Sequence, residues 1–187
     1  LEPMGMVVAP QLPSREWRDL YAALDCQVAA AVHPFYTASV REFQRAGRPV
    51  VGSAPVGLDG TAAWLESVGK AAGISDKKID AAKAKALPAI KAALADNPIN
   101  ATVTVSGYEG SELLVARLLI EAGAKVPYVG TACPKTPWSD PDREWLEAKG
   151  VHIQYRASLE QDLAAMQDVR PDLAIGTTPL VQKGKEL

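Results

Sequence analysis

The sequence is poor in cysteine and histidine, and neither sign of charge predominates. Its 187 residues contain two cysteines, Cys26 and Cys133, and neither has a second ligand at the spacing that structural zinc sites use. A disulfide framework or a structural zinc site is therefore not expected. The formal net charge of -2, without a long basic run, argues against nucleic acid or an anionic membrane surface as a partner.

Long hydrophobic runs are also absent, so we expect no membrane-spanning segment. The start carries no secretory leader, which favours a cytoplasmic location. Residues 1–5 resemble the middle of a chain, and we expect the sequence to be a fragment of a larger protein. The P-loop motif G-x-x-x-x-G-K-S/T is missing as well, so ATP hydrolysis on such a loop is not expected.

What the sequence does contain is an alternation of short β-branched runs with amphipathic helices, typical of βαβ units and a parallel sheet. In the first 74 residues this alternation predicts strands at 6–9, 27–32 and 49–52. Helices are predicted at about 36–46 and 61–72. Another is predicted after Ser14, with a buried stripe of Trp17, Leu20, Tyr21 and Leu24.

Residues 75–96 predict one long helix that is rich in alanine and lysine and is capped by Ser75. Pro88 lies inside this helix and removes a backbone hydrogen bond, which predicts a kink near residues 84–88. A helix of about 22 residues is roughly 33 Å long. That length is sufficient to connect two lobes.

A second alternating set predicts strands near 101–105, 126–130, 151–155 and 173–176, with a helix after each. The helix at 111–122 is expected to bury Val115, Leu118, Leu119 and Ala122. The predicted fold class is therefore α/β, with two Rossmann-like parallel-sheet lobes joined by a long helix. We expect an incomplete first lobe at 1–74, the linking helix at 75–98, and a second lobe at 99–187 that lacks its last strand.

The candidate ligand-binding residues follow the predicted strands. Doubly wound sheets bind ligands beyond the carboxyl ends of their strands, where the N–H groups of helix N-termini attract anions. In the second lobe these positions are Gly107, Tyr108, Glu109, Gly110, Thr131, Thr177 and Thr178. Their three loops are expected to line one crevice that holds a carboxylate or a flat ligand. Ordinary βα turns are the alternative, because the G-x-G-x-x-G fingerprint is incomplete.

His33 follows a strand of the first lobe and is expected either to face the same crevice or to be an ordinary hydrogen-bonded loop histidine. Cys133 is expected to be a small buried apolar residue rather than a ligand. Trp138 and Trp145 flank a helix start, as an exposed aromatic patch or as a hydrophobic staple. No catalytic residue and no metal ligand are identified from the residues alone.

Several ordered segments resemble the nitrogenase component 1 family. The most specific are Ser-Gly-Tyr-Glu-Gly-Ser-Glu at 106–112 and Ser-Asp-Pro-Asp-Arg-Glu-Trp at 139–145. The others are His-Pro-Phe-Tyr at 33–36, and the segments 55–61, 129–134 and 171–179. This resemblance runs over essentially the whole chain.

The resemblance implies one subunit of a catalytic component in which a Y-type chain pairs with a Z-type subunit. It further implies a [4Fe-4S] cluster in the full complex, with ligands outside this chain, and an ATP-hydrolysing iron-protein partner that delivers electrons from ferredoxin. The implied substrate is chlorophyllide a, whose ring-B C7=C8 bond is reduced in bacteriochlorophyll biosynthesis. This chain alone, without cluster or partner, is expected to be inactive.

Two other readings remain at this point. Receptors for metal chelates or cobalamin also join two α/β lobes by one long helix and bind their ligand between the lobes without redox chemistry. A structural α/β scaffold that serves only subunit assembly is the third possibility. Iron or acid-labile sulfide in a longer protein would favour the reductase, whereas tight binding of a chelate by this chain would favour the receptor.

Overall fold

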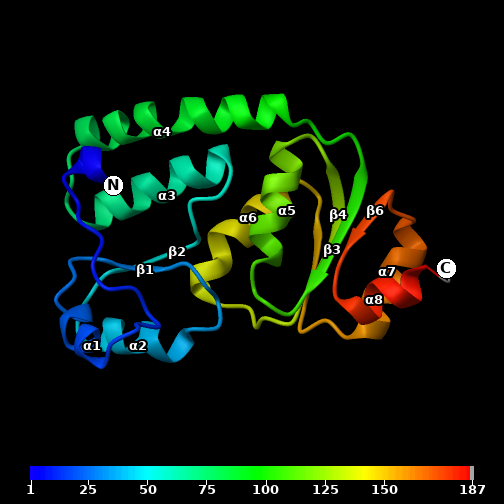
Figure 1. The fold of residues 1–187 in the computed structure, drawn as a ribbon, viewed down its shortest axis with the longest axis horizontal. Helices are drawn as coiled ribbons and strands as arrows, with labels where there is room; N and C mark the ends of the chain where they lie inside the picture. The colour runs from blue at the N-terminus through cyan, green and yellow to red at the C-terminus, as the bar shows by residue number, and fades with distance from the viewer. Residues whose placement is uncertain (186–187) are drawn as a thin grey trace.

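The computed structural model describes residues 1–185 and has the α/β architecture with parallel sheets that the sequence predicted (Figure 1). Its larger sheet has four parallel strands in the order β5-β4-β3-β6. These strands are β3 (Thr102–Gly107), β4 (Lys125–Thr131), β5 (His152–Tyr155) and β6 (Leu173–Ile175). A helix follows each strand, as in a Rossmann-like unit.

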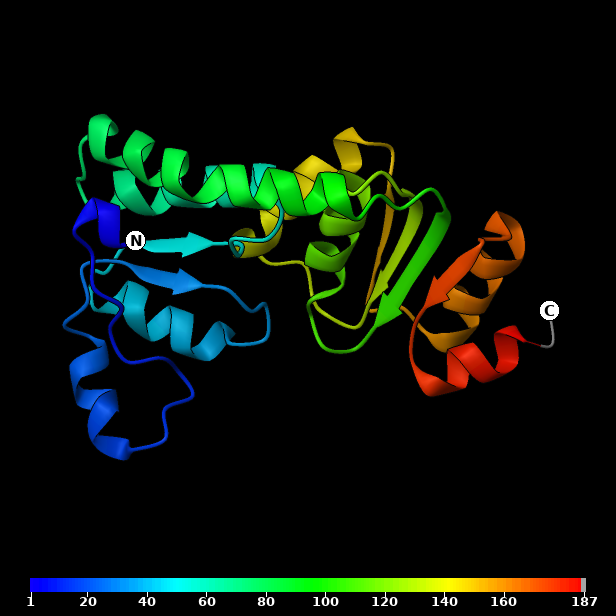
Figure 2. The same cartoon turned by 45° about the horizontal axis from the view of Figure 1, so that its top comes forward.

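The helices of this second unit cover both faces of its sheet. On the face toward the rest of the chain lie α5 (Glu112–Glu121) and α6 (Asp140–Ala148), and on the other lie α7 (Leu159–Val169) and α8 (Thr178–Gly184) (Figures 1 and 2). Because side chains alternate along a strand, Val103 and Val105 of β3 pack into the main hydrophobic core with Leu146 of α6. The intervening Thr104 and Ser106 are buried on the opposite face.

The amino-terminal unit has a smaller sheet, in which β1 (Ala29–Ala31) pairs in parallel with β2 (Val50–Gly52). Its helices are α1 (Trp17–Ala23), α2 (Thr37–Arg45) and α3 (Leu58–Ala71), with a short 3-10 turn, η1, at Glu2–Met4. A separate hydrophobic cluster of Met4, Leu65, Ile79 and Ala82 holds η1 and α3 against the long helix α4 (Asp76–Asp96).

The long helix matches the prediction closely. Ser75 occupies its N-cap position, although the side chain makes no capping hydrogen bond, and the helix continues through Pro88 without a break. The kink near residues 84–88 stays a prediction. Within residues 1–185, no helix combines the length and the apolar character needed to cross a membrane.

Two expectations for the amino-terminal unit are wrong. Residues 6–9 form no strand, and Val7 and Val8 are 92% and 61% exposed. The stripe predicted to be buried on α1 faces outward, with Trp17 65% and Tyr21 75% exposed. The physical reason is that no sheet among the described residues extends to this segment, so no surface is available to cover its apolar side chains.

The buried face of α5 also differs from the prediction. Leu118 is 42% exposed, whereas Glu112 and Arg117 are buried at 4% and 3%. Two charged residues lie inside because each finds a buried polar partner in the tertiary structure.

The division of the chain at residues 1–74, 75–98 and 99–187 stays a prediction. We call the amino-terminal unit the first lobe and the unit with the larger sheet the second lobe. The predicted end of the second lobe at residue 187 lies outside the described residues.

Candidate functional site

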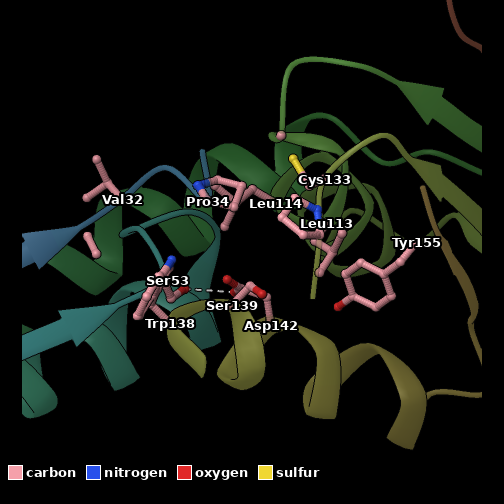
Figure 3. Close-up of a pocket in the computed structure, with 13 residues that line it drawn as sticks. Val32, Pro34, Ser53, Leu113, Leu114, Cys133, Trp138, Ser139, Asp142 and Tyr155 are labelled. Carbon is pink, nitrogen blue, oxygen red and sulfur yellow. Dashed lines mark hydrogen bonds between the residues drawn. The ribbon is translucent and has the colours of Figure 1, made fainter. Parts of the chain in front are cut away.

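A narrow cleft lies where the two lobes meet (Figure 3). The first lobe contributes the ends of its strands, including Val32, Pro34 and Ser53, and the second contributes α5, α6 and the loop after β4. The Tyr155 side chain points into the cleft toward Ser139 and Asp142 (Figure 3). The cavity volume is only about 20 Å³, which is room for about one water molecule. In this conformation the cleft is closed to a large ligand.

A buried ion pair lies beside the cleft. Arg117 Nη1 of α5 donates to Asp142 Oδ1 of α6 over 2.6 Å, and the two side chains are only 3% and 5% exposed. Ser53 Oγ of the first lobe donates to the same carboxylate oxygen over 2.7 Å. Burial raises the pKa of Asp142, and the hydrogen bond from Ser53 and the charge of Arg117 oppose that rise. This cluster therefore joins both lobes through one carboxylate.

A second set of polar contacts ties α3 to the second lobe. The Glu121 carboxylate at the end of α5 accepts hydrogen bonds from the backbone N–H groups of Leu58 and Asp59, the latter over 3.1 Å. A negative charge is favourable there because these N–H groups form the N-terminus of α3. Trp145 Nε1 donates to the Asp59 carboxylate over 3.2 Å. Gly57, with a φ of 69°, leaves the space that the Glu121 side chain fills.

The structure brings His33 and Gly110, two of the predicted crevice residues, to one point. A Cβ added to Gly110 would lie 2.8 Å from Pro34 Cγ, 2.9 Å from Cys133 Sγ and 3.2 Å from His33 Cε1. Gly110 also has a φ of 86°. Glycine is therefore required at this position by the close approach of the first lobe, and the His-Pro segment packs on the turn after β3.

The turn after β3 is occupied by the protein's own carboxylate. Glu112 accepts hydrogen bonds from the N–H groups of Glu109, over 2.9 Å, and Gly110, over 3.0 Å. It also accepts one from Thr131 Oγ1 over 2.8 Å, and Gly107 provides room for it because it lacks a Cβ. This is the position at which a helix N-terminus attracts an anion. Sequence reasoning missed Glu112, although a glutamate in the first helical turn after a glycine pair was the available signal.

The remaining predicted site residues differ in accessibility. Thr131 has no exposed surface, and its hydroxyl also accepts a hydrogen bond from the Cys133 N–H over 3.2 Å. Tyr108 is 49% exposed and Glu109 is exposed. Thr177 and Thr178 begin α8 after β6, and no hydrogen bond within residues 1–185 joins them to the cleft. The second lobe therefore exposes mainly Tyr108 and Glu109 of this turn.

An exposed aromatic cluster of His33, Phe35 and Tyr36 adjoins the cleft. The imidazole centroid of His33 lies 5.6 Å from the Phe35 ring and 5.3 Å from the Tyr36 ring. The Phe35 N–H donates to His33 Nδ1 over 3.3 Å, which orients the imidazole. Phe35 and Tyr36 are 45% and 43% exposed. The cluster offers flat apolar surface to a ligand outside the closed cleft.

A third buried acid, besides Asp142 and Glu112, lies on the opposite face of the sheet and was also missed from the sequence. Asp162 of α7 is 5% exposed and accepts a hydrogen bond from Tyr128 Oη over 2.8 Å. Burial raises the pKa of Asp162, against the lowering by the Tyr128 hydrogen bond. The missing Cβ of Gly130 leaves the space for this carboxylate. Asp162 thus holds α7 against β4.

The cysteines do not form a cluster site. Cys133 is 2% exposed, as expected for a small buried residue, and burial raises the pKa of its thiol. Cys26 is half-buried before β1 in the other lobe. Among residues 1–185, no three His, Cys, Asp or Glu side chains are arranged to hold a metal ion. A [4Fe-4S] cluster held by four cysteines does not fit the donors of this chain.

The family model for nitrogenase component 1 type oxidoreductases matches residues 1–187. The chain belongs to this family. Two curated relatives are chlorophyllide reductase 52.5 kDa chains, 66% identical in Cereibacter sphaeroides and 64% identical in Rhodobacter capsulatus. Both matches extend over all 187 residues of this chain, which span 37% and 38% of the length of the two relatives.

Solved structures show the family fold as well. A nitrogenase Cp1 structure at pH 6.5 has a TM-score of 0.62, with 14% identity over 95% of this chain and 42% of that chain. The structure of nitrogenase Cp1 at pH 5 gives a TM-score of 0.67, with 14% identity over 92% of this chain and 42% of that chain. At this level of identity the likeness concerns the fold. The two lobes joined by a long helix are therefore an arrangement of the nitrogenase component 1 type.

Proposed function

We propose that this chain is part of a catalytic subunit of a nitrogenase-like chlorophyllide a reductase. The supporting observation is the identity of 66% and 64% to two chlorophyllide reductase chains, which extends through both lobes and the linking helix. Membership of an oxidoreductase family favours this function over the metal-chelate or cobalamin receptor, whose fold is similar but whose chemistry is not redox.

The proposed reaction adds two electrons and two protons to the C7=C8 bond of ring B, which becomes a single bond. Electrons come from ferredoxin through an ATP-hydrolysing iron-protein partner, and the catalytic component pairs this subunit with a Z-type subunit in the cytoplasm. A [4Fe-4S] cluster in the full complex would supply the electron-transfer chemistry. Its ligands lie outside this chain, because neither Cys26 nor Cys133 has cysteine neighbours.

For the pigment, we propose contact with the exposed aromatic cluster rather than with the closed cleft. A cavity of about 20 Å³ excludes a tetrapyrrole ring. Phe35 and Tyr36, whose rings lie 5.6 Å and 5.3 Å from the His33 imidazole, provide the flat apolar surface that such ligands need. Tyr108 and Glu109 complete the exposed part of the proposed contact. The half-buried Gly107 and the buried Gly110 and Thr131 act by shaping the loops.

The function is tested with the longer polypeptide that contains this sequence, purified with its Z-type and iron-protein partners under anaerobic conditions. Chlorophyllide a, ATP and a reductant are added, and the product is identified by absorption and mass spectrometry. A gain of two mass units with loss of the C7=C8 bond is the expected result. An assembled complex that carries its cluster but leaves chlorophyllide a unchanged would refute the proposal.

The pigment contact is tested separately by titration of the same complex with chlorophyllide a without ATP, followed by the Soret band. Phe35→Ala and Tyr36→Ala together remove two aromatic rings from the proposed contact. An aromatic stacking contact contributes about 0.5–1.5 kcal/mol to the free energy of binding, so we expect the Kd for chlorophyllide a to rise roughly tenfold in the double variant. Leu118→Ala, on an exposed apolar residue of α5, is the matched control and should leave the Kd unchanged. An equal Kd for the double variant and the parent would exclude the aromatic cluster as a contact.

A further inference from the structure

Arg156 lies at the carboxyl edge of the larger sheet, the edge at which doubly wound sheets bind ligands. It directly follows β5, and the Ala157 N–H donates to the Thr131 carbonyl of β4 over 3.0 Å, which fixes this turn to the neighbouring strand. The connection from β5 to α7 lies at the same end of the sheet as the turn after β3 (Figure 1). Arg156 is exposed, so its guanidinium is available to an anion from solvent.

The backbone at Arg156 has an unfavourable conformation. Its φ is 51°, in the left-handed region that residues with a Cβ rarely adopt. Residues in this region persist where the surrounding structure holds them, and they concentrate at binding and active sites. Glycine would occupy the position without this conformational cost. The sequence thus carries a long cationic side chain at a turn whose shape favours glycine.

Arg156 forms no ion pair with a carboxylate among residues 1–185. Arg117, by contrast, is paired with Asp142 over 2.6 Å. The planar fork of N–H donors on a guanidinium matches the two oxygens of a carboxylate, which makes arginine the usual residue for carboxylate recognition. An unpaired guanidinium at a ligand-binding edge therefore favours a ligand that carries a carboxylate.

The strand register places Arg156 near the proposed pigment contact. The last residues of β3 and β5 pair with the same residue of β4. Tyr108 and Arg156, which follow these two strands, are therefore two strand spacings apart, about 10 Å. Glu109, beside Tyr108, is exposed and would repel an anion, whereas Arg156 would attract one. A flat ligand over Tyr108 is thus expected to direct a negatively charged substituent toward β5.

We propose that Arg156 binds the propionate carboxylate of chlorophyllide a and thereby orients the macrocycle beside the exposed aromatic cluster. This contact rests on the proposed function and adds to it the residue that recognises the acid form of the pigment. In chlorophyllide a the propionate is a free carboxylate, whereas in chlorophyll a it is the ester of a long alcohol. Arg156 is therefore a specificity-determining residue that selects the free acid over esterified pigments.

The contact is tested in the complex of the longer polypeptide with its Z-type subunit. The complex is titrated with chlorophyllide a and, separately, with its propionate methyl ester, without ATP and followed by the Soret band. A charge-assisted pair is lost with the ester, so we expect the parent to bind the free acid roughly tenfold or more tightly than the ester. Arg156→Gln should raise the Kd for the free acid by a similar factor and leave the Kd for the ester unchanged.

Arg170→Gln is the matched control. Arg170 is also exposed and also has a left-handed backbone, with a φ of 49°, but it precedes β6 at the opposite edge of the sheet. Its substitution should leave the Kd of both pigments unchanged. An increase in the Kd for the free acid as large as that of Arg156→Gln would overturn the proposal, because the effect would then not depend on the ligand-binding edge.

Arg156→Gly separates binding from stability. Glycine adopts a positive φ freely, so this variant removes the guanidinium and the conformational cost together. We expect its Kd for the free acid to rise as in Arg156→Gln, while its Tm equals or exceeds that of the parent. A Tm below that of the parent would show that the arginine serves the stability of the turn, and would overturn a role confined to the ligand.

Two results for Arg156→Gln would refute the carboxylate contact. One is a Kd for the free acid equal to that of the parent. The other is an equal rise for acid and ester, because Arg156 would then act on the loops rather than on the carboxylate. The proposed function is judged separately by product formation. A parent complex that reduces chlorophyllide a, with a Kd that Arg156→Gln leaves unchanged, would refute the contact alone.

Discussion

Asp142→Asn tests how much the charge of the buried ion pair between α5 and α6 contributes to the free energy of unfolding. The substitution keeps the size and the hydrogen-bonding shape of the side chain but removes its charge, so Arg117 stays buried at 3% exposure without a counter-ion. Removal of one partner of a buried ion pair typically costs about 3–5 kcal/mol. Total stabilities are about 5–15 kcal/mol. The variant should therefore lose a large part of its free energy of unfolding.

The converse substitution, Arg117→Met, should have a smaller and pH-dependent effect. Arginine cannot lose its proton, whereas Asp142 can become neutral, and burial already raises its pKa. An acid with a raised pKa in the folded state binds more protons when folded, so stability falls as pH rises through that pKa. The stability lost in Arg117→Met should be small below about pH 4 and should increase toward pH 7.

The free energy of unfolding is measured by urea titration with circular dichroism and tryptophan fluorescence at several pH values. Glu42→Gln is the control, because the Glu42–Arg45 pair is 60% and 72% exposed and should be worth less than about 1 kcal/mol. Asp142→Leu combined with Arg117→Met should recover most of the stability, since no charge remains buried. An Asp142→Asn variant within about 1 kcal/mol of the parent would refute the reasoning.

Three further predictions concern the effect on stability of substituting a glycine, a core leucine and a buried carboxyl group. Gly57→Ala should lower the free energy of unfolding by more than about 1 kcal/mol, because Gly57 has a φ of 69° and the new Cβ would meet the Glu121 carboxylate. Gly47→Ala is the control in the same urea titration and should cost less, because Gly47 has a φ of 71° but open space around it. Leu146→Ala removes a fully buried side chain and should cost about 2–5 kcal/mol, and a loss below 1 kcal/mol would contradict the core assignment. Asp162→Asn should gain stability relative to the parent as pH rises from 4 to 7, since burial raises the pKa of this carboxyl; a pH-independent difference would exclude a raised pKa.

The sequence predicted most elements of the second lobe because their periodicity is strong and local. The long helix from Asp76 to Asp96 agrees with the prediction to within a residue, and a helix follows each strand of the second lobe as predicted. The strand at 6–9 failed because β-branched residues favour a strand only when a sheet is available to pair with it. The α1 stripe failed for a related reason, since amphipathicity indicates which face seeks cover but not what covers it.

For the candidate site, too, some features followed from the sequence and others only from the tertiary structure. The sequence alone determined the α/β class and the long helix, because hydrophobic period and turn residues are local properties. The loops at which a ligand binds stay a prediction from the sequence. Only the tertiary structure decided that Gly110 is packed against His33 and Pro34, that Glu112 fills the turn after β3, and that Arg117 is buried with Asp142. The contacts of Gly110 with His33 and of Arg117 with Asp142 join residues far apart in the chain. Whether a charge is buried depends on a partner that no local pattern specifies.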